Sequence, residues 1–175
     1  MTIAAQLVES LRQPWRHGEH VDARDLVLED PLVLDGLTVR GLDLTGAVLR
    51  GGLSARGARF RGLAWLRGAQ VHGQCDLREA LFRTDLRADG LIAGDVVLDN
   101  SELQGVLSLA GARLGSLSLR DALVMANLTL ERAEIDGAAD LSGAEIMGGL
   151  WTANAQIGTL INGTAEISGR IRLPG

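Results

Sequence analysis

An eleven-residue rhythm of small and apolar residues runs from about Gly36 to the last residue of the chain. Each unit opens with a small residue, carries an apolar residue two places later, and often has Gly two places after that. A second apolar position, usually Leu, falls three residues before each new unit. The opening positions are Gly36, Ala47, Ala58, Ala69, Ala80, Asp89, Ser101, Ala112, Ala122, Ala133, Ala144, Ala155 and Ala165. A fixed period of this kind predicts a solenoid, in which each unit packs on its neighbours.

The same period also fits a right-handed α-helical coiled coil, but the small positions argue against it. On a helix the first and third positions of a unit lie about 200° apart, so the two most regular columns could not share a face. Glycine in most units would also cost a helix about 1 kcal/mol each relative to alanine. On a strand these two positions point the same way. Each unit therefore predicts short inward-facing strands joined by tight corners.

Strands this short bury an apolar face only when successive turns of the chain stack on one another. Two units make one four-sided turn, and the 13 openings give about six turns. At a strand spacing of about 4.8 Å the stack is a rod about 30 Å long.

The units resemble the pentapeptide-repeat family, whose repeat is Ala-Asp/Asn-Leu-x-x. Residues 139–143 (Ala-Asp-Leu-Ser-Gly) match it fully, and Cys75-Asp76-Leu77 and Thr84-Asp85-Leu86 match well. The chain departs from the pattern by one extra residue per pair of pentapeptides and by Leu in the small position. The resemblance covers roughly residues 36–173 and implies a right-handed, four-sided β-helix. We therefore expect an all-β solenoid: a right-handed quadrilateral β-helix of about six coils with a short N-terminal capping α-helix.

The segment before the repeat predicts the cap. Residues 2–13 read as an amphipathic helix with Thr2 as its N-cap, and Pro14 ends it. Such a helix covers the backbone edge of the first coil, which would otherwise offer a template for strand pairing. We assign residues 1–20 to the capping helix and connector, and residues 21–175 to the pentapeptide-like β-helix.

The repeat continues to the end of the sequence, which predicts an open strand edge on the last coil. We expect a tail-to-tail homodimer through Ile167, Ile171 and Leu173. Pro174 limits further pairing, which favours a closed dimer over a filament.

Charge is unevenly distributed along the chain, whose net charge is −5. Residues 47–88 carry 8 Arg and 3 acids, and acids predominate on both sides of this segment. Arg61 and Arg83 are two units apart and should stack on one outer face, and Arg67 and Arg87 should do nearly the same on the adjoining face. The candidate partner-binding residues are Arg59, Arg61, Arg67, Arg83 and Arg87. The competing interpretation is a solvated surface on which these arginines pair with neighbouring acids.

Several large apolar residues fall on outward positions of the predicted strands. A contiguous exposed stripe marks an interface, whereas isolated apolar residues do not. The alternative is that loops cover these residues locally. The candidate apolar interface consists of Leu81, Leu123, Met125 and Met147 on the face after the alanine position, with Trp65 and Trp151 on the next face.

Motifs for catalysis, cofactors or metals are absent from the sequence. His17 and His20 fall in a Gly-containing connector that we read as a solvated loop, and Cys75 takes an inward position expected of a buried, inert thiol. One cysteine excludes an intramolecular disulfide, and no phosphate-loop pattern occurs. No secretory signal or long apolar span is present, so we expect a cytoplasmic protein without cofactor, metal or membrane span.

These observations predict a non-enzymatic protein-interaction or structural scaffold module, a homodimeric rod with a protein partner. Direct nucleic-acid binding is disfavoured, because the chain is acidic and lacks interleaved aromatic residues. The alternative implied by the resemblance is a DNA-mimicking pentapeptide-repeat protein that binds DNA gyrase; the acidic ends fit it and the arginine-rich middle does not. A β-helix acyltransferase would need a left-handed hexapeptide period, which the eleven-residue period argues against.

Overall fold

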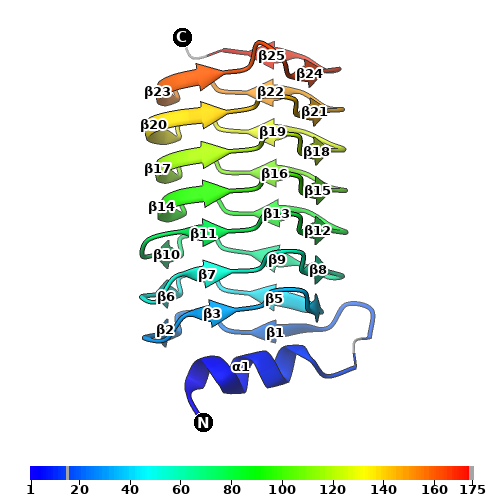
Figure 1. The fold of residues 1–175 in the computed structure, drawn as a ribbon, viewed down its shortest axis with the longest axis vertical. Helices are drawn as coiled ribbons and strands as arrows, with labels where there is room; N and C mark the ends of the chain where they lie inside the picture. Colours follow the sequence, from blue (N-terminus) through cyan, green and yellow to red (C-terminus); the bar gives the residue numbers. More distant parts are fainter. Residues whose placement is uncertain (15, 174–175) are drawn as a thin grey trace.

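The computed structural model describes residues 1–14 and 16–173, so Pro174 lies outside the described residues. One helix, α1 (Ile3–Leu11), lies across the end of a stack of short parallel strands (Figure 1). The chain is a parallel β-solenoid of about seven turns, which confirms the predicted all-β solenoid with a short N-terminal helix. Its handedness stays a prediction. Among the described residues, no helix has the length and apolar character needed to cross a membrane.

The strands form three sheets, called here A, B and C. Sheet A consists of β1 (His20–Asp22), β5 (Gly41–Asp43), β9 (Ala64–Trp65), β13 (Leu86–Arg87), β16 (Leu107–Ser108), β19 (Leu128–Thr129), β22 (Leu150–Trp151) and β25 (Ile171–Arg172). Sheet C consists of β4 (Thr38–Val39), β8 (Arg59–Phe60), β12 (Leu81–Phe82), β15 (Glu102–Leu103), β18 (Leu123–Val124), β21 (Glu145–Ile146) and β24 (Glu166–Ile167). Turns are numbered from the helix, each beginning at a strand of sheet A.

Sheet B covers the two remaining sides of the solenoid. Near the helix its strands are short: β2 (Val27–Leu28), β6 (Val48–Leu49) and β10 (Gln70–Val71) on the first side, and β3 (Leu32–Val33), β7 (Leu53–Ser54) and β11 (Cys75–Asp76) on the second. Farther up, one longer strand per turn runs along both sides: β14 (Ile92–Val97), β17 (Arg113–Ser118), β20 (Glu134–Asp140) and β23 (Gln156–Ile161). Glycine lets these strands pass the corner, since a Cβ on Gly94 would lie 2.6 Å from the carbonyl oxygen of Gly73.

The turns are not all of the same length, and the strictly constant period expected from the sequence is wrong in this respect. Leu81 pairs with Arg59 of the turn below and with Glu102 of the turn above, so the second interval is one residue shorter than the first. The stack also has about seven turns where about six were expected, because residues 20–39 already form a turn before the clear repeat begins.

Two of the predicted unit openings are wrong. Leu37 and Leu91, not Gly36 and Asp89, occupy the position that alanine holds elsewhere, and the N–H of each donates to the carbonyl three residues earlier. Gly36 and Gly90 take the preceding position with φ near +68° and +69°, where glycine meets no steric penalty. A search for small residues misses these units because leucine fills the small position.

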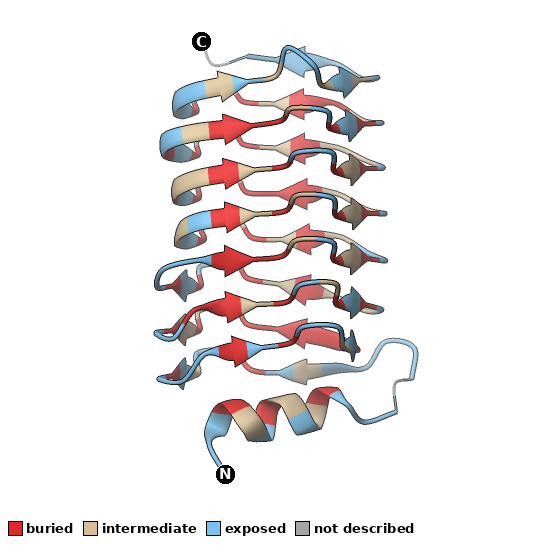
Figure 2. Cartoon of the chain, viewed as in Figure 1, coloured by how far each residue is buried: buried red, intermediate tan, exposed pale blue. Residues whose placement is uncertain are grey.

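Buried residues, mostly aliphatic, recur in turn after turn and form the core of the stack (Figure 2). The predicted second apolar column is buried in every turn where it was found, and each buried Leu contributes about 1.5–3 kcal/mol relative to an exposed one. Phe60 and Phe82 stack in neighbouring turns with ring centroids 4.7 Å apart. Leu7 and Leu11 of α1 pack on the first turn, and the hydroxyl of Thr2 accepts a hydrogen bond from the Ala5 N–H, which confirms Thr2 as the N-cap.

Candidate interaction surfaces

Sheet C and the corner after it carry two parallel columns of outward side chains, which together form the sheet C surface. The strand column contains Thr38, Arg59, Leu81, Glu102, Leu123, Glu145 and Glu166. The corner column contains Arg40, Arg61, Arg83, Gln104, Met125, Met147 and Ser168. The columns form because the first residue of each two-residue strand points out, and the second points into the core.

The half of this surface nearer the helix is basic. The structure places Arg83 directly above Arg61, as their spacing predicts, since the N–H of Arg83 donates to the Phe60 carbonyl of the turn below. Arg59 lies beside them on β8. The side chains of Arg59, Arg61 and Arg83 are exposed, and within the described residues they make no hydrogen bond or ion pair.

A shallow groove of ≈ 390 Å³ separates this basic cluster from the connector that follows α1. Arg61 contributes to its wall, and the remaining lining residues are His17, Gly18, Glu19, Gly62, Leu63, Trp65, Thr84 and Asp85. Arg40, below Arg61 in the corner column, lies 3.5 Å from the carboxylate of Glu19. Among the described residues, the groove wall therefore presents the unpaired guanidinium of Arg61 and the carboxylate of Glu19, which pairs with Arg40.

Arg67 and Arg87 do not stack on one another, and the prediction that they do so is wrong. Arg87 lies directly above Trp65 on sheet A and forms an ion pair with Asp85 at 2.9 Å. Arg67 lies two residues after Trp65, with its guanidinium 5.9 Å from the centre of the indole ring. These two arginines are therefore engaged within the molecule, unlike the three on sheet C.

The predicted apolar stripe is interrupted. Leu81 and Leu123 are half-buried and are separated in the strand column by Glu102, so they do not form a contiguous patch. Met125 and Met147 are adjacent in the corner column and are 49% and 54% exposed. Met125 also lies two residues after the outward Leu123 in the same turn, so these three residues are neighbours.

Trp65 and Trp151 lie on sheet A, in one outward column but four turns apart. Both are half-buried, and the guanidinium of Arg172 lies 4.9 Å from the ring of Trp151. The six apolar candidates therefore do not form a single interface. Four of them lie on the sheet C surface, and the two indoles lie on the adjoining sheet A, the next face along the chain, as expected from the sequence.

The half of the sheet C surface farther from the helix is acidic. Glu145 and Glu166 are exposed and, within the described residues, form no hydrogen bond or ion pair. Glu102 accepts a hydrogen bond from the Nε2 of Gln104 at 3.2 Å. The two methionines lie beside these glutamates. One flat surface thus carries unpaired positive charge at one end and unpaired negative charge at the other.

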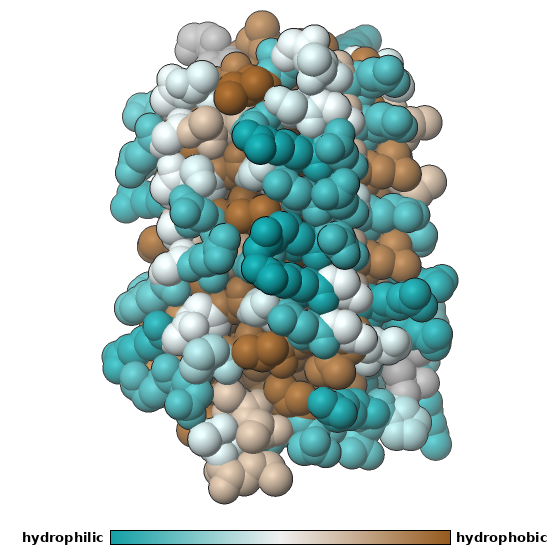
Figure 3. Space-filling view, viewed as in Figure 1, coloured by the Kyte–Doolittle hydropathy of each residue, from teal (hydrophilic) through white to brown (hydrophobic). Residues whose placement is uncertain are grey.

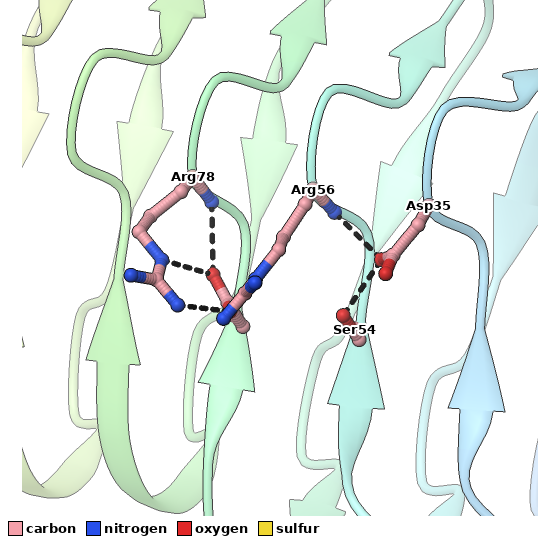
Figure 4. Close-up of polar contacts among 5 residues, drawn as sticks. Asp35, Ser54, Arg56 and Arg78 are labelled. Atoms are coloured by element: carbon pink, nitrogen blue, oxygen red, sulfur yellow. Dashed lines mark hydrogen bonds and ion pairs between the residues drawn. The ribbon is translucent and has the colours of Figure 1, made fainter.

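A ladder of polar side chains, not anticipated from the sequence, follows the second side of sheet B (Figure 4). Asp35 accepts hydrogen bonds from the Ser54 hydroxyl at 2.6 Å and from the Arg56 N–H at 3.0 Å. The Arg56 guanidinium then donates to Asp76 in the next turn, and Arg78 donates to the same carboxylate at 2.9 and 2.7 Å. The ladder thus links three consecutive turns.

The same ladder recurs three turns farther along the chain. Its members are Asp99, Ser118, Arg120, Asp140 and Ser142. Figure 3 shows hydrophilic side chains gathered in a strip along the long axis of the molecule. The Asp, Ser and Arg positions of the ladder recur at a spacing of three turns in the sequence. They do not recur in every unit, so the period of a single unit does not reveal them.

The ladder holds its carboxylates ionised. Burial by itself would raise the pKa of Asp76, but the hydrogen bonds from Arg78 and Arg56 outweigh burial and lower the pKa to about 2. The hydroxyl and N–H of Ser142, together with the guanidinium of Arg120, lower the pKa of Asp140 in the same way. Both carboxylates are nearly inaccessible to solvent, so their charge is satisfied inside the molecule.

The remaining predicted residues lie at the far end of the stack and in its core. At the end far from the helix, Ile171 and Leu173 are 49% and 57% exposed, and Ile167 is half-buried against the core. Cys75 is fully buried, and burial raises the pKa of its thiol to about 12. A thiol held in this state is a poor nucleophile.

Comparison with known proteins agrees with the geometry. A family model described as pentapeptide repeats (9 copies) matches residues 34–81, which form turns one to three of the solenoid. The match confirms, over these residues, the resemblance to pentapeptide repeats found in the sequence, a family of generally non-enzymatic repeat scaffolds. No curated protein matches the chain significantly.

Proposed function

We propose that this repeat scaffold is a non-enzymatic interaction module that binds an acidic protein partner through Arg59, Arg61 and Arg83. The observation that carries the proposal is the state of these guanidiniums: they are exposed, adjacent and, within the described residues, unpaired on a rigid sheet. Elsewhere Arg24, Arg56 and Arg120 each bind an aspartate of their own chain.

Rigid presentation favours binding because little backbone freedom is lost when a partner docks. Unpaired charge at the surface also accelerates encounter with an oppositely charged partner and selects against basic ones. Such binding should weaken steeply with salt, since the Debye length falls from about 10 Å at 0.1 M to about 3 Å at 1 M.

The test uses fluorescent poly-glutamate as the probe, titrated with the full chain at low salt and followed by fluorescence anisotropy. We expect the charge reversal Arg61→Glu with Arg83→Glu to weaken binding at least about tenfold, and added salt to do the same. A matched control reverses Arg132 and Arg170, which are exposed and also unpaired within the described residues. Equal loss in both double variants, or no binding by the native chain, would contradict the proposal.

The acidic half of the sheet C surface favours a second candidate, the DNA mimic that binds DNA gyrase. Glu102, Glu145 and Glu166 form a row on turns four, six and seven, although Leu123 interrupts it. A gyrase supercoiling assay tests this function directly. Inhibition or protection that disappears when these three glutamates are changed to Gln would support it, and absence of any effect of the native chain would reject it.

Homodimerisation through the end of the stack stays a prediction, supported by the exposed side chains of Ile171 and Leu173. Replacing Ile171 with Asp should abolish a dimer of this kind, as judged by light scattering across a concentration series. A dimer unchanged by that substitution would exclude this interface.

A further inference from the structure

The sheet C surface has an order of side chains that is complementary to itself. In the strand column, Arg59 lies two turns below Glu102 and Glu145 lies two turns above it. Leu81 and Leu123 lie one turn below and one turn above the same residue. Reversing the column about turn four therefore places positive against negative charge, and leucine against leucine.

We propose that two copies of this chain associate side by side and antiparallel through the sheet C surface, about a two-fold axis at turn four. The axis lies between the two surfaces and runs perpendicular to both rods. Turn two of one copy then meets turn six of the other, so Arg59 faces Glu145 twice in the dimer. Turn three meets turn five, so Leu81 faces Leu123 twice. Each contact occurs in pairs, as isologous association requires.

The corner column fits the same arrangement. Arg61 comes opposite Met147 and Arg83 comes opposite Met125, so the aliphatic stems of the arginines cover the exposed thioethers. Each Arg83 also lies one turn from the axis, where its guanidinium offsets the repulsion between the two copies of Glu102. The exposed methionines and the unpaired arginines thereby contact one another between chains, whereas within one chain they lie in different turns.

The two registers shifted by half a turn lose this complementarity. Moving the axis half a turn toward the helix places Arg59 against Leu123 and Leu81 against Glu102. Moving it half a turn the other way places Leu81 against Glu145 and Glu102 against Leu123. Because each half-turn register buries a carboxylate against leucine, the charge and apolar pattern disfavours both of them.

The association should be weak. Five paired turns at about 4.8 Å make a strip only about 20–25 Å long, which buries less than the roughly 800 Å² per partner of a standard interface. At one rim the arrangement also brings Glu79 of one copy toward Asp121 of the other, and both are exposed acids. If the proposed function holds, this self-association covers the arginines that bind the acidic partner, so the two events exclude one another.

Sedimentation equilibrium of the full chain, from about 10 µM to about 500 µM, tests the proposal at low and high salt. We expect reversible dimers at low salt that dissociate as salt screens the Arg59–Glu145 pairs. Arg59→Glu alone and Glu145→Arg alone should each weaken the dimer at least about tenfold, because each places like charges opposite one another.

The decisive sample is an equimolar mixture of the two single variants. In a mixed dimer one site keeps its native Arg59–Glu145 pair. At the other site the Arg59→Glu side chain of one copy faces the Glu145→Arg side chain of the other, so opposite charges again face one another. Two variants that are each monomeric alone should therefore associate when combined, and the double variant with both substitutions should also dimerise. Arg59 and Glu145 lie four turns, about 19 Å, apart within one chain, so only contact between chains can produce this recovery.

Three outcomes would overturn the proposal: a native chain that stays monomeric at every concentration, single variants that are not rescued by mixing, or a dimer insensitive to these charges but lost in Ile171→Asp. The last result would assign association to the end of the stack. Circular dichroism of each variant confirms that the solenoid is intact. None of these readouts depends on binding of an acidic partner, so this proposal and the proposed function can fail independently.

Discussion

The second side of sheet B and the sheet C surface carry similar charged residues on the same rigid stack, yet use them differently. On sheet B, Asp76 and Asp140 each lie between arginine or serine donors of the same and the neighbouring turn, so their charge is satisfied internally. On sheet C, like charges occupy neighbouring turns, and Arg59 lies two turns from Glu102 and four turns from Glu145. The vertical order of residues, not the composition, decides whether a charge stabilises the fold or remains available to a partner.

The largest loss of stability is expected when the sheet B ladder loses a carboxylate. Asp76→Asn removes the carboxylate that binds both Arg56 and Arg78, and should lower the free energy of unfolding by about 2 kcal/mol. Urea denaturation at pH 7 measures the change. The matched control is Glu145→Gln on sheet C, whose stability should stay within about 0.5 kcal/mol of the native chain. Equal losses in the two variants would remove the distinction between the surfaces.

The contribution of Asp76 should also depend on pH. Its pKa is about 2 in the folded chain and 3.8 ordinarily, so the ionised form stabilises the fold above about pH 4. As pH falls from about 4 to about 2 the carboxylate becomes protonated in the folded state too, and this stabilisation is lost. Thermal melts of the native chain and Asp76→Asn should therefore converge over that range. A constant difference down to about pH 2 would contradict the assignment.

A smaller loss of stability is expected when a serine of the sheet B ladder is replaced. Ser118→Ala removes the hydroxyl that donates to Asp99, while the Arg120 N–H still binds that carboxylate. The free energy of unfolding should fall by about 1 kcal/mol. Ser168→Ala, on the exposed corner column of sheet C, is the control and should be neutral by the same urea titration.

The smallest effect on stability is expected from the basic cluster. Replacing Arg59, Arg61 and Arg83 together with Ala should change the free energy of unfolding by no more than about 0.5 kcal/mol, because none of the three has a partner within the described residues. A marked loss of stability in urea would show that these side chains support the fold rather than a partner.

The sequence predicted the features of this molecule that follow from the spacing of residues in successive units. The buried leucine column follows from spacing alone, and so does the placement of Arg83 above Arg61. The first turn was harder to find because Leu26 and Leu37 fill the small position there. A pattern built on alanine and glycine therefore passes over a turn that the structure forms as regularly as the others.

Features that depend on several turns could not be predicted in the same way. The corner within sheet B is one residue longer in some turns than in others, so the period is not constant along the stack. The shift decides which outward residues align, and hence that Glu102 separates Leu81 from Leu123. The ladder joins side chains of consecutive turns, so a pattern followed one unit at a time does not reveal that Arg56 meets Asp76.

The stacking of turns of nearly constant length has a consequence for how such a chain can evolve. A duplication or deletion of one whole turn leaves every other turn with the neighbours it needs, so the rod changes length while the fold persists. An added turn between Leu81 and Leu123 would preserve the mirror order of sheet C, whereas one between Arg59 and Leu81 would destroy it. Gain of turns can therefore redirect what the rod binds without altering how it folds.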